Sequence, residues 1–140
     1  MSKTHITANG EAMEKESIGK SREDYLEAIL ILIRKKGACR STDVASQLGF
    51  SKPSASIALK KLEEEGFIVR DDWRILLTEA GQKIAENMLD KHSFFTGWFE
   101  KIGIDAATAE EEACQLEHVI SDESFAKISA YLRARDESLT

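Results

Sequence analysis

The sequence predicts a mainly α protein, in which an N-terminal winged helix-turn-helix is followed by an all-helical region. One proline among 140 residues agrees with a largely helical chain. Two short helical segments separated by a tight turn precede a pair of strand-like segments, which is the order of elements in a winged helix-turn-helix. Beyond these, apolar residues recur at helical spacing almost to the end of the chain.

The first helix is expected after a flexible N-terminal tail over residues 1–20, which show no apolar periodicity. Ser21 is suited to cap a helix over residues 21–37, with Asp24 at its third position and Gly37 after its last turn. The apolar face of this helix would consist of Tyr25, Ile29, Leu32 and Ile33.

Two shorter helices are expected next. Ser41 is suited to cap a helix that ends near Gly49, and Ser51 to cap a helix that ends at Gly66. The buried stripe of the second would consist of Ala55, Ala58, Leu59 and Leu62.

Residues 67–78 indicate a β-hairpin that turns at Asp71 and Asp72. Together with the preceding helices it completes a winged helix-turn-helix domain over residues 21–82.

The remaining residues, 83–140, indicate an all-helical domain. Thr78 can cap a long helix that runs to residue 103, and Asp105 can cap the next one, over residues 105–120. A last helix follows over residues 121–135, with Phe125, Ile128 and Leu132 on one face.

Cys39 lies outside this region and is expected to be a small core residue.

Charge and composition restrict the class of protein. The net charge is −6, and residues 83–140 account for it with six basic and twelve acidic side chains. No apolar run reaches about 18 residues and the N-terminus lacks the apolar core of a signal peptide, so we expect no membrane association. Two cysteines do not form a disulfide framework, which favours a cytoplasmic protein with reduced thiols.

The start of the helix after Ser51 is suited to contact DNA. In a helix-turn-helix the second helix enters the major groove, and this one begins with hydroxyls and a cation and without carboxylates. The expected contacts are Ser51, Lys52, Pro53, Ser54, Ser56 and Lys60, with Arg74 in the hairpin. The alternative is that the winged helix is a protein–protein module. Because the domain has no net charge, tight binding would require a dimer on two half-sites.

Cys114, Glu117 and His118 follow the spacing i, i+3, i+4, which places them on one face of a helix. Sulfur, oxygen and nitrogen donors that converge on one point are suited to a divalent transition metal. The alternative is a small buried cysteine beside a solvated charged pair. The acidic pair Asp24 and Glu27 gives a weaker signal, since Asp24 also fits a helix cap.

Several sequence blocks resemble one known family over about residues 21–132. They are "EDYLEAI", "STDVASQLGFSKPSASIALKKLEEEGFIV", "LTEAGQKIA", "KH" at 91–92 and "EACQLEHVISDE". The chain resembles the diphtheria-toxin-repressor and manganese-transport-regulator family of metal-dependent repressors. The sequence shows no third, SH3-like domain, and in this respect it resembles the short, manganese-type members of the family.

The resemblance implies one metal site whose ligands are Asp24, Glu27, His92, Cys114, Glu117 and His118. Cys114 follows the iron-type members where manganese-type members have a glutamate, whereas Asp24 follows the manganese type. Thr96 stands where the iron type has a glutamate of its ancillary site. The site is therefore mixed, and both the metal and the number of ions stay open.

The resemblance further implies a cofactor, a partner and a mechanism. We expect Mn or Fe(II) as the physiological metal, and Zn or Co to bind in vitro. A metal held by both domains would orient the DNA-reading heads of a homodimer on a palindromic operator in double-stranded DNA, so the protein would repress metal-uptake genes. The dimer contact is expected at Trp98, Phe125, Ile128 and Leu132, for which an intrachain core is the alternative.

Two other classes of function remain as alternatives. A metal-independent winged-helix regulator would carry a vestigial metal site. A metalloenzyme would need a general base near the cluster or an HExxH-type motif, and neither is present, so we expect no enzymatic activity.

Overall fold

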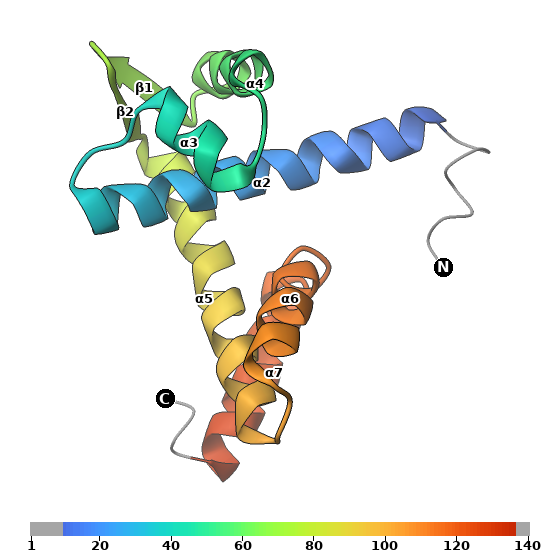
Figure 1. Cartoon of the computed structure of the whole chain (residues 1–140). Coiled ribbons are helices and arrows are strands. Elements are labelled where there is room, and N and C mark those ends of the chain that lie inside the picture. The colour runs from blue at the N-terminus through green and yellow to red at the C-terminus, as the bar shows by residue number, and fades with distance from the viewer. Residues whose placement is uncertain (1–9, 137–140) are drawn as a thin grey trace. The chain divides into compact units, whose positions relative to one another are not determined.

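The computed structural model describes the backbone of residues 10–136 and the side chains of residues 22–136. In chain order its elements are α2 (Gly10–Lys36), α3 (Ser41–Leu48), α4 (Lys52–Glu64), β1 (Ile68–Asp71), β2 (Arg74–Leu77), α5 (Glu79–Lys101), α6 (Ala106–Leu116) and α7 (Asp122–Arg135), as Figure 1 shows. The predicted mainly α fold is confirmed. Within this part of the chain, no helix combines the length and the apolar character needed to cross a bilayer.

The chain divides into two compact units, Met1–Glu86 and Asn87–Thr140. The division falls inside α5, a little beyond residue 82, where the sequence indicated the end of the winged helix-turn-helix. The two units are described separately below.

The first helix of the first unit begins earlier than predicted. α2 starts at Gly10, so the expected tail is wrong for residues 10–20, and Ser21 lies inside the helix. Residues 1–9 lie outside the described part of the chain. Glutamate, lysine, alanine and methionine in this segment have favourable helix propensities, which let a helix continue without an apolar stripe. Of the predicted apolar face, Tyr25, Ile29 and Leu32 are buried and Ile33 is half-buried.

Helix α3 begins at Ser41, the residue that was predicted to cap it. Arg40, not Ser41, is the N-cap residue, and its backbone N–H donates to Oδ2 of Asp43 at 3.0 Å. This hydrogen bond, with the nearby Lys36 ammonium, lowers the pKa of Asp43. Gly49 ends the helix in a left-handed conformation, with φ of 74°, as a C-terminal glycine commonly does.

Helix α4 has the predicted cap and the predicted buried stripe. Ser51 Oγ accepts from the N–H of Ser54 at 3.2 Å, and Pro53 occupies the first turn. Ala55, Leu59 and Leu62 of this stripe are buried and Ala58 is half-buried, while the opposite side of α4 is exposed.

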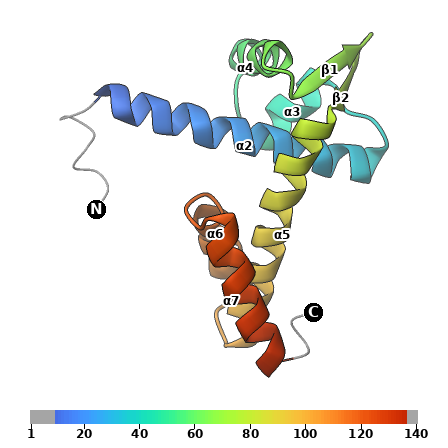
Figure 2. The same ribbon diagram turned by 180° about the vertical axis from the view of Figure 1, so that it is seen from behind.

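The hairpin β1–β2 is antiparallel, and Ile68 pairs with Leu77 at its base. Its turn is formed by Asp72 and Trp73, one residue later than predicted, with φ of 62° at Asp72. Ile68 and Ile75 are buried and fix the hairpin to the unit's core. In both views α4 and the hairpin lie on the same side of α2 (Figure 1 and Figure 2).

The second unit packs the C-terminal half of α5 with α6 and α7 around an aromatic core. Phe94, Phe95 and Ala113 are buried at its centre. The partly buried residues around them are Trp98, Phe99, Leu116, Ile120, Phe125, Ile128 and Leu132. Ala109 and Ala113 are fully buried, and these small side chains allow α6 to pack closely within the unit.

Candidate metal centre and nucleic-acid interface

Helix α6 provides one side of the candidate metal centre. Asp105 caps the helix as predicted, because its side chain accepts from the N–H of Thr108 at 3.1 Å. The helix ends at Leu116, earlier than predicted, so Glu117 is the C-cap and His118 lies in the turn that follows. Glu117 keeps helical backbone angles, which preserves the i, i+3 relation between Cys114 and Glu117.

Three of the predicted ligands meet in the second unit. One donor atom each from His92, Cys114 and Glu117 lie within 4.8 Å of one another. Nitrogen, sulfur and oxygen donors at this separation form a group that a single transition-metal ion can bridge. Of the three residues predicted to converge from their spacing, Cys114 and Glu117 meet here with His92 of α5, whereas His118 lies on the side of the other Glu117 oxygen.

The carboxylate of Glu117 is the most distinctive group in the cluster. Its side chain is fully buried, and its Oε1 lies 2.9 Å from Nδ1 of His92. Its Oε2 has no hydrogen-bond partner among the described residues, and Nε2 of His118 lies 3.7 Å from it. A buried carboxylate is costly unless a cation or hydrogen bonds compensate it. This orphaned oxygen fits a site that receives a metal ion.

The imidazole of His92 lies between two carboxylates. Its Nδ1 faces Glu117, and its Nε2 lies 2.9 Å from Oε2 of Glu110. A metal-bound histidine commonly donates its other ring N–H to a carboxylate, which fixes the ring and its tautomer. Glu110 was not identified from the sequence. The available signal was its position four residues before Cys114, on the same face of α6.

A buried cation fixes the turn that carries Glu117 and His118. Lys91 is buried, and its Nζ donates to the carbonyl of Ile120 at 2.7 Å and pairs with Asp122 at 3.0 Å. The ammonium group of Lys91 therefore holds the C-terminal end of the segment between α6 and α7 in place. It also places a positive charge next in sequence to His92.

Of the six predicted ligands, two belong to the first unit. Asp24 is half-buried and Glu27 is buried, and both lie on α2, three residues apart. Cys114 is solvent-accessible, whereas Cys39 is fully buried, as predicted for a core residue. The role of Asp24 and Glu27 in metal binding stays a prediction.

The exposed side of α4 carries the predicted DNA contacts. Ser51, Lys52, Pro53, Ser54, Ser56 and Lys60 are all exposed. Ile57 lies among them with 72% of its surface exposed and was not singled out from the sequence. The feature of the sequence that could have identified Ile57 is that it is an aliphatic residue outside the predicted buried stripe of this helix. Arg74 in β2 is exposed and pairs with Asp71 at 2.5 Å.

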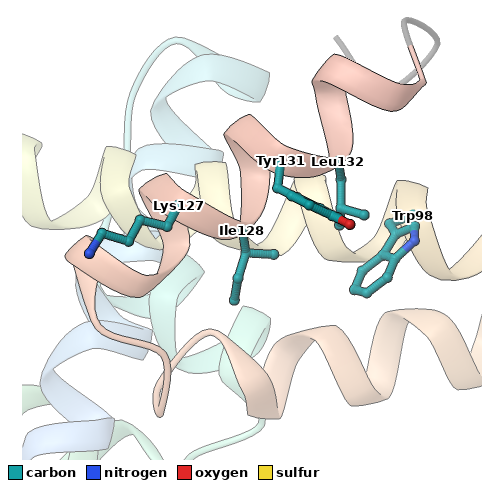
Figure 3. A pocket seen from close by; sticks show the side chains of 5 residues that line it. All are labelled: Trp98, Lys127, Ile128, Tyr131 and Leu132. Carbon is teal, nitrogen blue, oxygen red and sulfur yellow. The ribbon is translucent and has the colours of Figure 1, made fainter.

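Three of the four predicted dimer residues line an apolar groove in the second unit. A pocket of about 390 Å³ is bordered by Trp98 of α5 and by Lys127, Ile128, Tyr131 and Leu132 of α7 (Figure 3). Trp98, Ile128 and Leu132 also pack against the intrachain core, and so does Phe125. Tyr131 is 58% exposed and was not singled out from the sequence.

Two family models match the chain. Residues 17–73 match the N-terminal DNA binding domain of iron dependent repressors, and residues 78–138 match their metal binding and dimerisation domain. The chain therefore belongs to the diphtheria-toxin-repressor and manganese-transport-regulator family of metal-dependent transcriptional repressors. Members of this family are DNA-binding regulators, which confirms the expectation that the chain is not an enzyme.

Curated relatives come from bacteria and an archaeon. The transcriptional regulator MntR of Escherichia coli O6:H1 is 34% identical over 104 residues, which cover 74% of this chain and 67% of the relative. An uncharacterized HTH-type transcriptional regulator of Methanocaldococcus jannaschii is 34% identical over 118 residues, which cover 82% of this chain and 94% of the relative.

Two solved structures of similar fold contain bound metals. A manganese-dependent transcriptional repressor in complex with manganese has a TM-score of 0.69 at 28% identity, covering 79% of this chain and 52% of the other. The structure of ScaR with bound Zn²⁺ has a TM-score of 0.66 at 27% identity, covering 79% and 53%. The chain thus spans about half the length of these solved structures.

Proposed function

We propose that the protein represses metal-uptake genes by binding operator DNA as a homodimer when Mn or Fe(II) is bound. The observation that carries the proposal is the buried carboxylate of Glu117, with the donor atoms of His92 and Cys114 within 4.8 Å, in a chain that also has a winged helix-turn-helix.

The proposed metal ligands are those that the family resemblance implies. His92, Cys114, Glu117 and His118 come from the second unit, and Asp24 and Glu27 from the first. Glu110 would hold the second nitrogen of His92 and orient its ring, while Lys91 would hold the turn after α6. When bound, the metal would supply positive charge to the buried carboxylate of Glu117.

The donor set leaves the choice of metal balanced. Carboxylates favour Mn, whereas the thiol of Cys114, which must lose its proton to bind, favours Fe(II), Co or Zn. We propose Mn or Fe(II) as the physiological ligand, and binding of Zn and Co in vitro. Two similar structures, one with bound manganese and one with bound Zn²⁺, agree with a site of broad selectivity.

The proposed DNA surface is the exposed side of α4 together with the hairpin. Serine hydroxyls and lysine ammonium groups would contact phosphates and base edges in the major groove. The exposed side chain of Ile57 would contact a thymine methyl group. The contacts are Ser51, Lys52, Pro53, Ser54, Ser56, Ile57, Lys60 and Arg74.

The proposed dimer contact is the groove at Trp98, together with Phe125, Ile128 and Leu132. A second copy of the chain would cover the apolar groove and the exposed ring of Tyr131. A twofold dimer presents two α4 helices, which fits a palindromic operator in double-stranded DNA.

Metal and DNA would then bind with positive coupling. A coupling of about 1–3 kcal/mol corresponds to a change in DNA affinity of roughly 5–150-fold, and the effect is reciprocal.

The decisive test compares DNA affinity with and without metal. Duplexes retained by the manganese-loaded protein from a pool of random sequences define the operator. Fluorescence anisotropy then measures its affinity after chelation and with Mn, Fe(II), Zn or Co. We expect affinity to rise with metal, and the protein to fall to monomer when Trp98 and Leu132 are both changed to Asp. Equal affinity in all conditions would instead favour the metal-independent regulator with a vestigial site.

A further inference from the structure

The segment before α3 is tied to the hairpin, and this brings two exposed side chains together. The N–H of Ile75 in β2 donates to the carbonyl of Cys39 at 2.9 Å. Arg40 follows Cys39 directly, and Trp73 precedes Ile75 by two residues. The backbone bond therefore places Arg40 beside the turn of the hairpin.

Arg40 and Trp73 form an exposed stack. The guanidinium carbon of Arg40 lies 4.2 Å from the centroid of the Trp73 ring. Trp73 is 45% exposed, and Arg40 is exposed as well. A cation held over an indole face keeps the N–H groups at the edge of its plane available for hydrogen bonds.

The neighbouring cation, Arg74, is in a different situation. It lies 6.0 Å from the same ring and pairs with Asp71 at 2.5 Å, so a carboxylate offsets its charge. The acid closest in sequence to Arg40 is Asp43, whose carboxylate accepts from the Arg40 backbone N–H at 3.0 Å. The charge of Arg40 contributes to lowering the pKa of Asp43, but the ion pair of that carboxylate is with Lys36, at 3.4 Å. Of the two guanidinium groups at Trp73, that of Arg40 is thus the better placed to receive an external anion.

We infer that Arg40, held in place by Trp73, contacts a phosphate of the DNA backbone beside the hairpin. The hairpin and α4 lie on the same side of α2, so a duplex on α4 extends toward this stack (Figure 1). The ligand chemistry is a phosphodiester, which a guanidinium edge binds through two parallel N–H donors. Arg40 then positions the duplex and carries no sequence information, and Trp73 acts through Arg40. This inference rests on the proposed DNA-binding function.

The test uses the full chain loaded with manganese and measures duplex affinity against salt concentration. Arg40→Gln should weaken binding to operator and to unrelated duplex by the same factor. Loss of one phosphate contact lowers the salt slope by about 0.9 per site, which corresponds to roughly 5-fold in affinity at physiological salt. Arg40→Lys should restore the slope, a result that a purely structural role for Arg40 would not produce. Arg74→Gln, the matched control, should weaken binding less than Arg40→Gln.

A double-mutant cycle tests the role of Trp73. Trp73→Ala should weaken binding in the parent protein and have little effect in Arg40→Gln, since it acts through the lost guanidinium. Independent effects of the two changes would overturn the positioning role. If Trp73→Ala does not fold, Trp73→Phe, which keeps an aromatic ring, replaces it in the cycle.

The outcomes separate this inference from the proposed function. Parent protein that binds the operator, with Arg40→Gln unchanged in affinity and salt slope, overturns the Arg40 contact alone. Parent protein that binds no duplex with any metal overturns both.

Discussion

Nδ1 of His92 on α5 lies 2.9 Å from Oε1 of Glu117, the residue that ends α6. The two groups meet because α6 stops at Leu116, so that Glu117 is its C-cap residue. The side chain of Glu117 is fully buried there. The second unit therefore brings an imidazole, a carboxylate and a thiol together by its own packing. This arrangement makes the metal centre testable residue by residue.

Glu117→Gln should abolish tight metal binding and leave the fold intact. The amide keeps the size of the side chain and its contact with His92 but removes the charge that a cation compensates. Outer partners of metal ligands are worth about 10–100-fold in affinity, so a direct ligand should cost at least about 100-fold. Isothermal titration with Mn and Zn measures the loss. Glu110→Gln, which changes only the orienting carboxylate of His92, should cost about 10-fold. Equal losses in the two variants would contradict these assignments.

Local signals predicted the caps at Ser51 and Asp105. They were wrong for Ser21 and Ser41, and they failed where packing decided the ends of helices. Ser51 and Asp105 cap their helices because serine and aspartate accept backbone N–H groups of the next turn wherever the chain starts a helix. Ile120 continues the apolar stripe of α6, which made the helix seem to extend to residue 120. The chain instead turns after Leu116, where buried Lys91 binds the carbonyl of Ile120. That contact joins residues 29 apart and leaves no local pattern.

The candidate site was also predictable only where the signal was local. The spacing of Cys114 and Glu117 indicated one face of a helix, and the resemblance added His92. The contact of His92 with Glu110 and the stack of Arg40 on Trp73 each join separate elements, and no spacing rule relates them.

The two cysteines should react at very different rates with a thiol reagent. Burial, with a smaller effect of Asp43, raises the pKa of Cys39 to about 11, so its reactive thiolate is scarce at pH 8. Cys114 is solvent-accessible. In the folded protein we expect one fast-reacting thiol, with the second reacting only in urea. Mn or Zn should slow the fast reaction, and Cys114→Ser should remove it. A rate at Cys114 that metal does not change would argue against its role as a ligand.

Ile57 should contribute to recognition of thymine. Its side chain is 72% exposed on the side of α4 proposed to face the major groove, where thymine presents a methyl group. Ile57→Ala should weaken operator binding by at least about 5-fold, the equivalent of one or two buried methylene groups, and leave unrelated duplex unaffected. An operator with uracil in place of thymine provides the matched control. It should bind the parent protein more weakly but bind Ile57→Ala as well as the thymine operator does. If uracil weakens binding of both proteins equally, Ile57 does not contact the methyl group.

Two glycines of α5 should respond to alanine in opposite directions. A Cβ at Gly81 would lie 2.1 Å from the carbonyl oxygen of Phe67, a backbone atom that cannot move alone. Gly81→Ala should therefore lower the free energy of unfolding by about 1–3 kcal/mol. A Cβ at Gly97 would have no atom within 4 Å, so Gly97→Ala should raise it by about 0.5–1 kcal/mol through better helix propensity. Urea unfolding followed by circular dichroism measures both. A neutral Gly81→Ala would contradict the close approach of α5 to Phe67.

Asp105 should make the second unit sensitive to acid. Hydrogen bonds from the side chain and the backbone N–H of Thr108 lower its pKa below the ordinary 3.8. The folded state therefore binds this proton less readily than the unfolded state. The stabilisation is complete above the unfolded-state pKa and is lost as the pH falls through the lower folded-state value. Asp105→Asn can still accept at the cap but does not titrate, so its unfolding free energy should fall less steeply with acid. Glu112→Gln controls for the loss of one acidic group from α6. Parallel acid profiles for Asp105→Asn and the parent protein would show that this cap does not contribute to the acid response.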